Sequence, residues 1–222
     1  NPPKHMLLAS TSSAYGADTD MPYRETQKAD HQMSFYAATK KATETMAHSY
    51  AHLYKLPITM FRFFTVYGPW GRPDMAPMKF AKRILSGSPI DVYNHGAMKR
   101  DFTYVDDLVH ALSLLLNKAP GKTPVSKTFD SLSPVAPFRV VNIGNNSHIE
   151  LQDFIAILEQ EIGEKAIQNM MDMQLGDVPE TWADTRLLQA LTGYSPTTDL
   201  RKGVKSFIKW YLDYYRDTIS IN

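Results

Sequence analysis

The chain has 222 residues and contains no cysteine. Disulfide bonds, iron–sulfur clusters, thiolate zinc sites and cysteine nucleophiles are therefore all excluded. Neither charge is in excess, since Lys and Arg number 24 against 23 Asp and Glu, for a formal net charge of +1. Electrostatics thus gives no reason to expect nucleic acid or an anionic membrane as a partner. The seven histidines show no ligand spacing with acidic partners, so we expect no metal site.

Long hydrophobic runs are missing as well. The longest mostly apolar stretch covers residues 108–116, and His110 and Ser113 interrupt it. It is far shorter than the roughly 18 consecutive apolar residues that indicate a membrane span. Residues 1–5 lack the apolar core and the small-residue cleavage site of a signal peptide. We therefore expect a soluble, cytoplasmic protein.

A glycine-rich turn for a dinucleotide is the third absence. The 11 glycines form neither Gly-x-Gly-x-x-Gly nor Gly-x-x-Gly-x-x-Gly, and only Gly68 and Gly71 lie within three residues of each other. Such a turn lets backbone N–H groups approach the pyrophosphate at a helix N-terminus. The sequence therefore lacks the usual means of holding a dinucleotide.

What the chain does contain is an alternation of buried strands and amphipathic helices. The predicted strands are 6–9, 58–64, 90–94, 101–104 and 138–143, and the predicted helices are 34–55, 78–85, 106–117, 149–162, 184–191 and 200–217. Residues 118–137, with four prolines, are expected to form the longest loop. This order predicts an α/β fold with a parallel sheet. Because residues 6–9 already have the character of a fully buried strand, we expect a doubly wound sheet that begins before residue 1.

The first long helix carries a candidate catalytic pair. Ser34 is the expected N-cap, Pro57 blocks continuation, and an apolar series recurs at helical spacing: Phe35, Ala38, Ala42, Met46, Tyr50 and Leu53. Tyr36 and Lys40 are four residues apart, so their side chains project from the same face. A free tyrosine with a pKa of about 10 is a poor base at neutral pH, and a nearby ammonium group favours the phenolate. The pair alone is weak evidence, because Tyr-x-x-x-Lys is common by chance.

The surroundings of the pair strengthen the hypothesis. Residues 10–13 form a Ser/Thr cluster directly after the first predicted strand, and residues 62–74 carry a second strand into a Gly- and Pro-rich loop. Ligands of open α/β sheets bind outside the carboxyl ends of the strands. Residues 10–13 alone could be a helix cap or turn, and residues 62–74 alone could be a structural loop. Neither structural role explains why the two segments flank the Tyr–Lys helix in this order.

The combination of motifs is similar to a known family. The Ser/Thr cluster ending in Tyr15-Gly16, the Tyr36/Lys40 pair and the run Arg-Phe-Phe-Thr-Val-Tyr-Gly-Pro at 62–69 resemble the extended short-chain dehydrogenase/reductases that act on nucleotide sugars. Residues 99–107 and 176–184 fit the same group, so the resemblance covers nearly the whole chain. The likeness is greatest to UDP-glucuronate 4-epimerases. It implies NAD-dependent epimerisation at C4 of a UDP-sugar, from UDP-glucuronate to UDP-galacturonate, through a 4-keto intermediate.

The resemblance also assigns roles. Tyr36 would take the proton of the sugar 4-hydroxyl while hydride leaves C4 for NAD, and Thr11 would bridge the hydroxyl and the phenol. Lys40 would lower the pKa of the tyrosine and hold the nicotinamide ribose, with Phe63 as a further cofactor contact. The 4-keto sugar would then turn its other face and recover the hydride, so that NAD is not consumed.

The two residues after Thr11 discriminate between reactions of this family. Dehydratases resemble the pattern Thr-Asp-Glu here, since expelling water needs a carboxyl acid/base pair, and UDP-glucuronate decarboxylases tend to carry a glutamate two positions after the threonine. This chain has Ser12 and Ser13. Neither serine can act as a carboxyl acid or base, which disfavours both alternatives and leaves epimerisation.

The substrate contacts implied by the resemblance are Ser12, Ser13, Thr65, Arg72, Tyr93, Arg100 and Asp177. The hydroxyl groups resemble uronate-carboxylate contacts, and an arginine such as Arg72 can bind a carboxylate bidentately. Arg100 matches the family's diphosphate-binding arginine, Tyr93 an aromatic near the base, and Asp177 a residue near the nucleotide ribose. Where the family has a second diphosphate arginine, this chain has Met173 and Gln174, neither of which carries a positive charge.

The expected organisation follows from these matches. Residues 1–70 are predicted to be the end of a Rossmann-type doubly wound domain. Residues 71–222 are predicted to form mainly a smaller α/β domain that binds the nucleotide sugar, with some segments returning to the Rossmann-like sheet. The absent glycine-rich part would hold NAD in a complete enzyme, which by resemblance is a homodimer. One alternative is a chain that stands alone as a non-catalytic module for nucleotide-sugar binding or interaction. Another is a different nucleotide-sugar epimerase or dehydratase of the same family.

Overall fold

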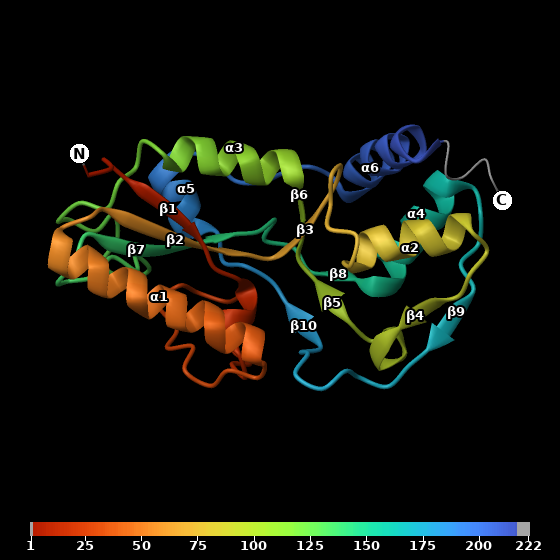
Figure 1. Ribbon diagram of the computed structural model, residues 1–222, viewed down its shortest axis with the longest axis horizontal. Coiled ribbons are helices and arrows are strands. Elements are labelled where there is room, and N and C mark those ends of the chain that lie inside the picture. The colour runs from red at the N-terminus through yellow and green to blue at the C-terminus, as the bar shows by residue number, and fades with distance from the viewer. Residues whose placement is uncertain (1, 217–222) are drawn as a thin grey trace.

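A computed structural model describes residues 2–216 of the chain. Figure 1 shows two lobes joined by short strands. The helices are α1 (Phe35–Tyr54), α2 (Ala76–Leu85), α3 (Val105–Leu115), α4 (Leu151–Ile162), α5 (Arg186–Thr192) and α6 (Leu200–Tyr214), with 3₁₀ turns η1 (Ser12–Tyr15) and η2 (Tyr93–Gly96). The strands are β1 (Met6–Ala9), β2 (Ile58–Phe63), β3 (Thr65–Tyr67), β4 (Ile90–Val92), β5 (Lys99–Arg100), β6 (Phe102–Tyr104), β7 (Phe138–Ile143), β8 (Ile149–Glu150), β9 (Gln168–Met170) and β10 (Glu180–Thr181).

The first lobe is built on a three-stranded parallel sheet with the order β1-β2-β7. Met6 lies opposite Ile58, and Ile58 lies opposite Phe138. Strands β2 and β7 are almost wholly buried, as expected for a parallel sheet that helices cover on both faces. The predicted α/β fold with a parallel sheet is confirmed.

Helices pack on both faces of this sheet. Met60 on β2 packs with Ala47 and Ala51 of α1, whereas the next residue, Phe61, packs on the opposite face in a cluster with α3 and α5. Alternation along a strand sends successive side chains to opposite faces. Because β7, α3 and α5 come from beyond residue 70, the sheet lobe draws on both of the predicted segments (Figure 1).

Helix α1 begins and ends as the sequence predicts, but its buried face is different. The Ser34 side chain accepts a hydrogen bond from the Ala37 backbone N–H at 3.1 Å, and Lys55 ends the helix in a left-handed conformation. The buried positions are Ala37, Glu44, Ala47 and Ala51. All six members of the apolar series named above are exposed. Small alanines let the helix lie close to the sheet, and they give a weaker sequence signal than the larger residues that face outward.

The second lobe has its own core. Helices α2, α4 and α6 enclose a cluster in which the rings of Phe102 and Phe154 are stacked at 4.3 Å. Parallel strands β4 and β9 flank this lobe, and β5 lies between β10 and β8 in the connecting region. Residues 118–137 contain no helix or strand, as predicted.

The short strands differ most from the sequence prediction. Strands β5, β8 and β10 have two residues each, and β8 takes the first two positions of the helix predicted from residue 149. Such short strands form only because segments distant in the chain pair with one another, so no local sequence pattern predicts them. The C-terminal helix was predicted to reach residue 217; it ends at Tyr214, and residue 217 lies outside the described residues.

Candidate active site

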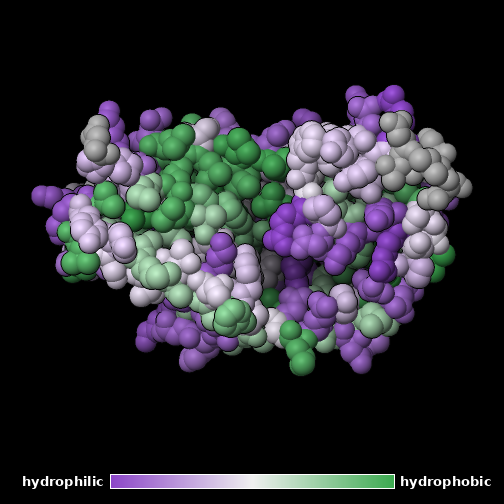
Figure 2. Space-filling model, viewed as in Figure 1, coloured by the Kyte–Doolittle hydropathy of each residue, from purple (hydrophilic) through white to green (hydrophobic). Residues whose placement is uncertain are grey.

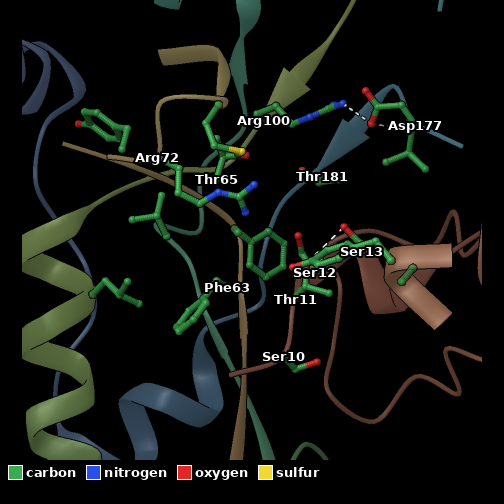
Figure 3. A pocket seen from close by; sticks show the side chains of 18 of the residues that line it. Ser10, Thr11, Ser12, Ser13, Phe63, Thr65, Arg72, Arg100, Asp177 and Thr181 are labelled. Atoms are coloured by element: carbon green, nitrogen blue, oxygen red, sulfur yellow. Dashed lines mark hydrogen bonds and ion pairs between the residues drawn. The ribbon is translucent and has the colours of Figure 1, made fainter. Parts of the chain in front are cut away.

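A cavity of about 660 Å³ opens where the carboxyl ends of β1 and β2 meet the start of α1 and the second lobe (Figure 3). Every residue that the sequence analysis proposed for the site lines this cavity, except Lys40 and Tyr93. Segments far apart in the chain therefore converge here: the end of β1, the first turn of α1, β2 with β3, and the loop around residue 177. Their order around the cavity follows from the parallel sheet, whose strands all end at the same edge.

Thr11 and the serines that follow it form one wall. The chain leaves β1 and turns into η1, with Thr11 as the N-cap. The Thr11 hydroxyl accepts a hydrogen bond from the Ser13 backbone N–H at 3.2 Å and lies 3.3 Å from the Ser13 hydroxyl. Gly16 closes the turn at a φ of 63°, where a Cβ would lie 2.0 Å from the carbonyl oxygen of His31. Only glycine fits this position, which explains the Tyr-Gly ending of the motif.

Tyr36 and Lys40 take different places relative to the cavity. Tyr36 lines it and is half-exposed. Lys40 does not line it; its Nζ donates a hydrogen bond to the carbonyl oxygen of Ala9, at 3.4 Å. Ala9 ends β1, two residues before Thr11. Lys40 therefore lies behind the cavity wall, where it connects α1 to β1, the strand that leads to Thr11.

A buried ion pair that the sequence analysis missed lies between α1, the helix of Tyr36 and Lys40, and β2. Glu44 accepts two hydrogen bonds from Arg62 on β2, at 2.8 and 2.7 Å, and one from the Ser10 hydroxyl at 2.6 Å. Burial alone would raise the pKa of Glu44, but the hydrogen bonds and charge of Arg62 outweigh it and hold that pKa below its usual range. The pair ties α1 to β1 and β2. Its sequence signal was an acidic residue four positions after Lys40 and the arginine that opens the 62–69 motif.

A second buried network supports the loop over residues 16–33. Arg62 lies 4.4 Å from the ring centre of Tyr15, which stacks on Tyr23 at 4.3 Å. The Tyr15 hydroxyl donates to the Asn142 side chain at 2.7 Å, and the Asn142 backbone N–H donates to Glu25 at 2.8 Å. Burial raises the pKa of Glu25 to about 8 and that of Tyr23 to about 12. The sequence motifs included Tyr15 and Arg62, but their contacts with Tyr23, Asn142 and Glu25 were missed, because these residues are far apart in the chain.

Thr65 and Arg72 form the facing wall. Thr65 opens β3, and its backbone N–H donates to the carbonyl oxygen of Asp101 at 3.0 Å. The Arg72 side chain extends into the cavity near Thr65 in Figure 3. Its guanidinium is paired with Asp74, through Nε to Oδ1 at 3.1 Å and Nη2 to Oδ2 at 2.5 Å. Arg72 is thus placed where a ligand carboxylate could reach it.

Arg100 and Asp177 close the far end of the cavity as a pair. The Arg100 guanidinium donates to Asp177 at 2.9 Å and to the carbonyl oxygen of Pro179 at 3.1 Å. Burial lowers the pKa of Arg100, and the carboxylate of Asp177 opposes this effect. Two residues that were proposed for different parts of the nucleotide are therefore in direct contact.

Tyr93 lies away from the cavity in η2, where Asn94 and His95 turn the chain in left-handed conformations.

The described residues provide only part of a dinucleotide site. Tyr36 and Phe63 line the cavity, and Lys40 lies just behind it. No glycine-rich strand-to-helix turn occurs within residues 2–216. Gly68 has a φ of 137°, and a Cβ there would lie 2.7 Å from Val105, so close packing against α3 accounts for this glycine. The resemblance assigns these residues to the nicotinamide end of NAD, and the described residues offer no glycine-rich cradle for its pyrophosphate.

Within residues 2–216, no group of three or more His, Cys, Asp or Glu side chains is arranged to hold a metal ion. None of the helices in this part of the chain is both long enough and apolar enough to cross a membrane.

Comparison with solved structures supports the fold. MoeE5 in complex with UDP-glucuronic acid and NAD is 31% identical, with a TM-score of 0.81, and the match covers 95% of this chain and 66% of that one. UDP-glucuronic acid 4-epimerase from Bacillus cereus, in complex with UDP-glucuronic acid and NAD, is 30% identical with a TM-score of 0.79; the match covers 95% of this chain and 62% of that one.

Comparison with curated proteins gives closer relatives. A probable UDP-glucuronate 4-epimerase from Rhizobium meliloti (strain 1021) is 54% identical over 217 residues, which are 96% of this chain and 64% of the relative. UDP-glucuronate 4-epimerase 4 from Arabidopsis thaliana is 47% identical over 219 residues, 97% of this chain and 49% of the relative. The chain thus spans less than two thirds of the length of these relatives. The model of the NAD dependent epimerase/dehydratase family matches residues 1–127, and this chain belongs to that family.

Proposed function

We propose that the protein containing this chain catalyses the NAD-dependent epimerisation of a UDP-sugar at C4, converting UDP-glucuronate to UDP-galacturonate. The observation that carries the proposal is the meeting of Tyr36 and Thr11 in one cavity, with serines at both positions after the threonine. Epimerisation requires a base and a hydride acceptor but no carboxyl acid near C5 or C6. The names of the relatives described above agree with this choice.

Tyr36 is the proposed base. Its phenolate takes the proton from the sugar 4-hydroxyl, and Thr11 orients that hydroxyl by hydrogen bonding. NAD, when bound, supplies the oxidising power by accepting hydride from C4. Lys40 is proposed to hold the nicotinamide ribose from the position where its Nζ donates to the carbonyl oxygen of Ala9, at 3.4 Å. Loss of the O–H proton and the C4 hydride leaves a ketone at C4.

The return step inverts the configuration. The 4-keto sugar turns its other face toward the hydride donor, C4 regains the hydride, and Tyr36 returns the proton to the oxygen. Atoms and electrons balance over the two steps, so no net oxidant is needed. A cavity of about 660 Å³ gives a hexose room to turn while its nucleotide stays bound.

The two ends of the substrate are assigned to different walls. Ser12, Ser13, Thr65 and Arg72 are proposed to bind the uronate carboxylate, three through hydroxyl groups and one through a bidentate guanidinium. Arg100 is proposed to bind the diphosphate, with Asp177 near the ribose. The Arg100–Asp177 contact of 2.9 Å supports the view that these two residues act at adjoining parts of the nucleotide.

The assembly and compartment are proposed as well. We infer a cytoplasmic homodimer that uses the exposed apolar face of α1, where Phe35, Met46, Tyr50 and Leu53 reach solvent. A contiguous exposed apolar face commonly marks an interaction site. The absence of cysteine is in keeping with a reducing compartment.

Turnover of a defined substrate tests the proposed function. The full-length protein is incubated with NAD and UDP-glucuronate, and the sugar nucleotides are separated by chromatography. We expect UDP-galacturonate to accumulate to a constant ratio without net formation of NADH. Binding of UDP-glucuronate without any product would favour the alternative, a non-catalytic nucleotide-sugar-binding module. Release of carbon dioxide or water from the substrate would instead favour a decarboxylase or dehydratase.

A further inference from the structure

The arginine that faces the sugar already holds a carboxylate from this chain. Arg72 and Asp74 form a two-point contact, with Nε on Oδ1 and Nη2 on Oδ2. This is the arrangement in which arginine binds a carboxylate most specifically. Arg72 lines the cavity and Asp74 does not. One of the two guanidinium edges that can bind a carboxylate through two N–H groups, the Nε/Nη2 edge, is therefore occupied by a side chain from outside the cavity.

Local geometry delivers Asp74 to this position. The Met75 backbone N–H donates to the Arg72 carbonyl oxygen at 3.1 Å, which closes a turn over residues 72–75 with Pro73 at its second position. Proline fixes φ near the value that this position of a turn requires. The two charged side chains thus meet within a four-residue turn, and both are largely exposed, at 68% for Arg72 and 62% for Asp74.

The negative charge of Asp74 remains stabilised by its surroundings when Arg72 is not paired with it. It lies just before α2, which has no side-chain cap, and a negative charge near a helix N-terminus is favourable. Hydrogen bonds from Arg72 are the main cause of its lowered pKa, and the charge of Lys79 lowers that pKa further. Release of Arg72 therefore does not leave Asp74 isolated.

The loop backbone is anchored, whereas the arginine side chain is long and largely exposed. Trp70, in a left-handed conformation with φ 62°, packs on Trp210 and Tyr214 of α6 at ring-centre distances of 5.4 and 4.8 Å. The backbone two residues before Arg72 is thereby tied to the second lobe. An exposed guanidinium can change partner by rotating its side chain, with no movement of this anchor.

We propose that Asp74 is a specificity-determining residue, a built-in carboxylate that holds Arg72 until the carboxylate of a uronic acid sugar replaces it. The inference rests on the proposed function, because it takes UDP-glucuronate as the ligand. A neutral hexose leaves the Arg72–Asp74 pair intact and gains no contact from it. For a uronate, the free energy gained from binding Arg72 is reduced by the free energy lost when the Arg72–Asp74 pair breaks. This exchange limits the affinity for the substrate and aids release of the product, which carries the same charge.

Calorimetric binding of three ligands to the full-length protein with NAD tests the proposal. UDP-glucuronate, UDP-glucose and UDP are titrated into the wild type and into Asp74→Asn, which keeps the shape of the side chain and removes its charge. We expect UDP-glucuronate to bind about two- to five-fold more tightly to the variant, the effect of one exposed ion pair. The affinities for UDP-glucose and UDP should not change.

Two further variants separate the proposed exchange from general electrostatics. Asp20→Asn is the matched control, since Asp20 is also 62% exposed and paired with an arginine, and neither residue lines the cavity. It should leave all three affinities unchanged. In an Arg72→Ala background, Asp74→Asn should no longer affect UDP-glucuronate, because Asp74 acts only through that arginine.

The outcomes distinguish this inference from the proposed function. A wild type that binds UDP-glucuronate no better than UDP-glucose would count against the uronate substrate itself. A clear wild-type preference that Asp74→Asn leaves unchanged or weakens would overturn the exchange alone. Equal tightening of all three ligands would also overturn it, because that pattern reports only the loss of a negative charge near an anionic ligand.

Discussion

At the scale of single residues, the position of Tyr36 follows from where its helix starts. Ser34 caps α1, so Tyr36 falls in the first turn, at the end of the helix that meets the cavity. Thr11 reaches the same cavity because β1 ends at Ala9 and the chain turns at once into η1. Two local signals, a cap and a strand end, thus bring a phenol and a hydroxyl to one place.

Replacing Tyr36 with Phe tests the proposed base. The variant keeps the ring and loses the hydroxyl, so turnover of UDP-glucuronate should fall by about 10²- to 10⁴-fold, the usual contribution of a general base. Its affinity for UDP-glucuronate should stay within about two-fold of the wild type. Tyr54→Phe, on the same helix but exposed, outside the cavity and outside the proposed dimer face, is the control and should turn over normally. Comparable rates for the two variants would remove Tyr36 from the mechanism.

A pH-dependent contribution to stability is expected from Glu25. Burial raises the pKa of its carboxyl group from 4.5 to about 8. The folded protein therefore binds more protons than the unfolded chain between these values, and stability falls as pH rises from about 4.5 to about 8. The slope contributed by this one group is at most about 1.4 kcal/mol per pH unit.

Glu25→Gln removes this titration while keeping an acceptor for the Asn142 backbone N–H. Urea unfolding of both proteins is measured between pH 5 and pH 8, at about one-unit steps. The stability of the variant relative to the wild type should increase toward the upper pH. Parallel profiles would mean that the buried carboxyl group does not take up a proton in the folded protein.

At the scale of elements, the register of α1 on the sheet depends on one buried ion pair. Glu44 and Arg62 are 4% and 2% exposed, and they connect the helix that carries Tyr36 to β2. The Ser10 hydroxyl joins the same carboxylate from the end of β1, next to Thr11. A polar contact of this kind has one favourable geometry, whereas alanines packed on a sheet permit sliding.

Glu44→Gln should therefore destabilise the protein strongly. It leaves the Arg62 charge buried without a counter-charge, which typically costs about 3–5 kcal/mol. Urea unfolding measures the loss. Asp213→Asn, which breaks a fully exposed pair with Arg216, should cost less than about 1 kcal/mol. A double variant with Met at both 44 and 62 should recover much of the stability, and equal losses for the single and double variants would contradict the explanation.

At the scale of the whole molecule, exposed apolar surface is the main unexplained feature of the sheet lobe. Figure 2 shows apolar side chains gathered over this lobe, and both Val109 of α3 and Leu116, the residue that follows α3, are exposed. Strand β1 lies at an edge of the three-stranded sheet. The exposed face of α1 adds a second apolar surface, on which the proposed homodimer depends.

A charge placed in that face should weaken the dimer. Met46 is 58% exposed in the middle of α1, between Phe35 and Leu53 along the apolar face. Met46→Lys in the full-length protein should shift sedimentation equilibrium toward the monomer, because a buried ammonium group would lack a partner. Thr45→Lys, exposed on the adjoining face of the helix, is the control. A monomeric wild type, or equal masses for both variants, would exclude this face as the dimer contact.

Local patterns in the sequence were sufficient to predict the main elements and to select residues that, for the most part, line one cavity. Strands β1, β2 and β7 appeared as short apolar runs, and Ser34 and Pro57 marked the limits of α1. The Ser/Thr cluster and the 62–74 segment were placed at the cavity because parallel strands end at a common edge. Lys40 and Tyr93 were expected in the cavity and do not line it, since side-chain reach and the turn after β4 depend on packing.

The sequence by itself determined the α/β class, the helix that carries Tyr36 and the position of Thr11 after a strand, because each has a signal within a few residues. The tertiary structure alone decided which face of α1 is buried, the contacts of Glu44 with Arg62, and the pairing of Arg100 with Asp177. These contacts join residues 18 and 77 positions apart in the chain. The interaction energies of these contacts depend on burial and geometry that exist only once the sheet and both lobes have formed. No local sequence pattern could therefore predict them.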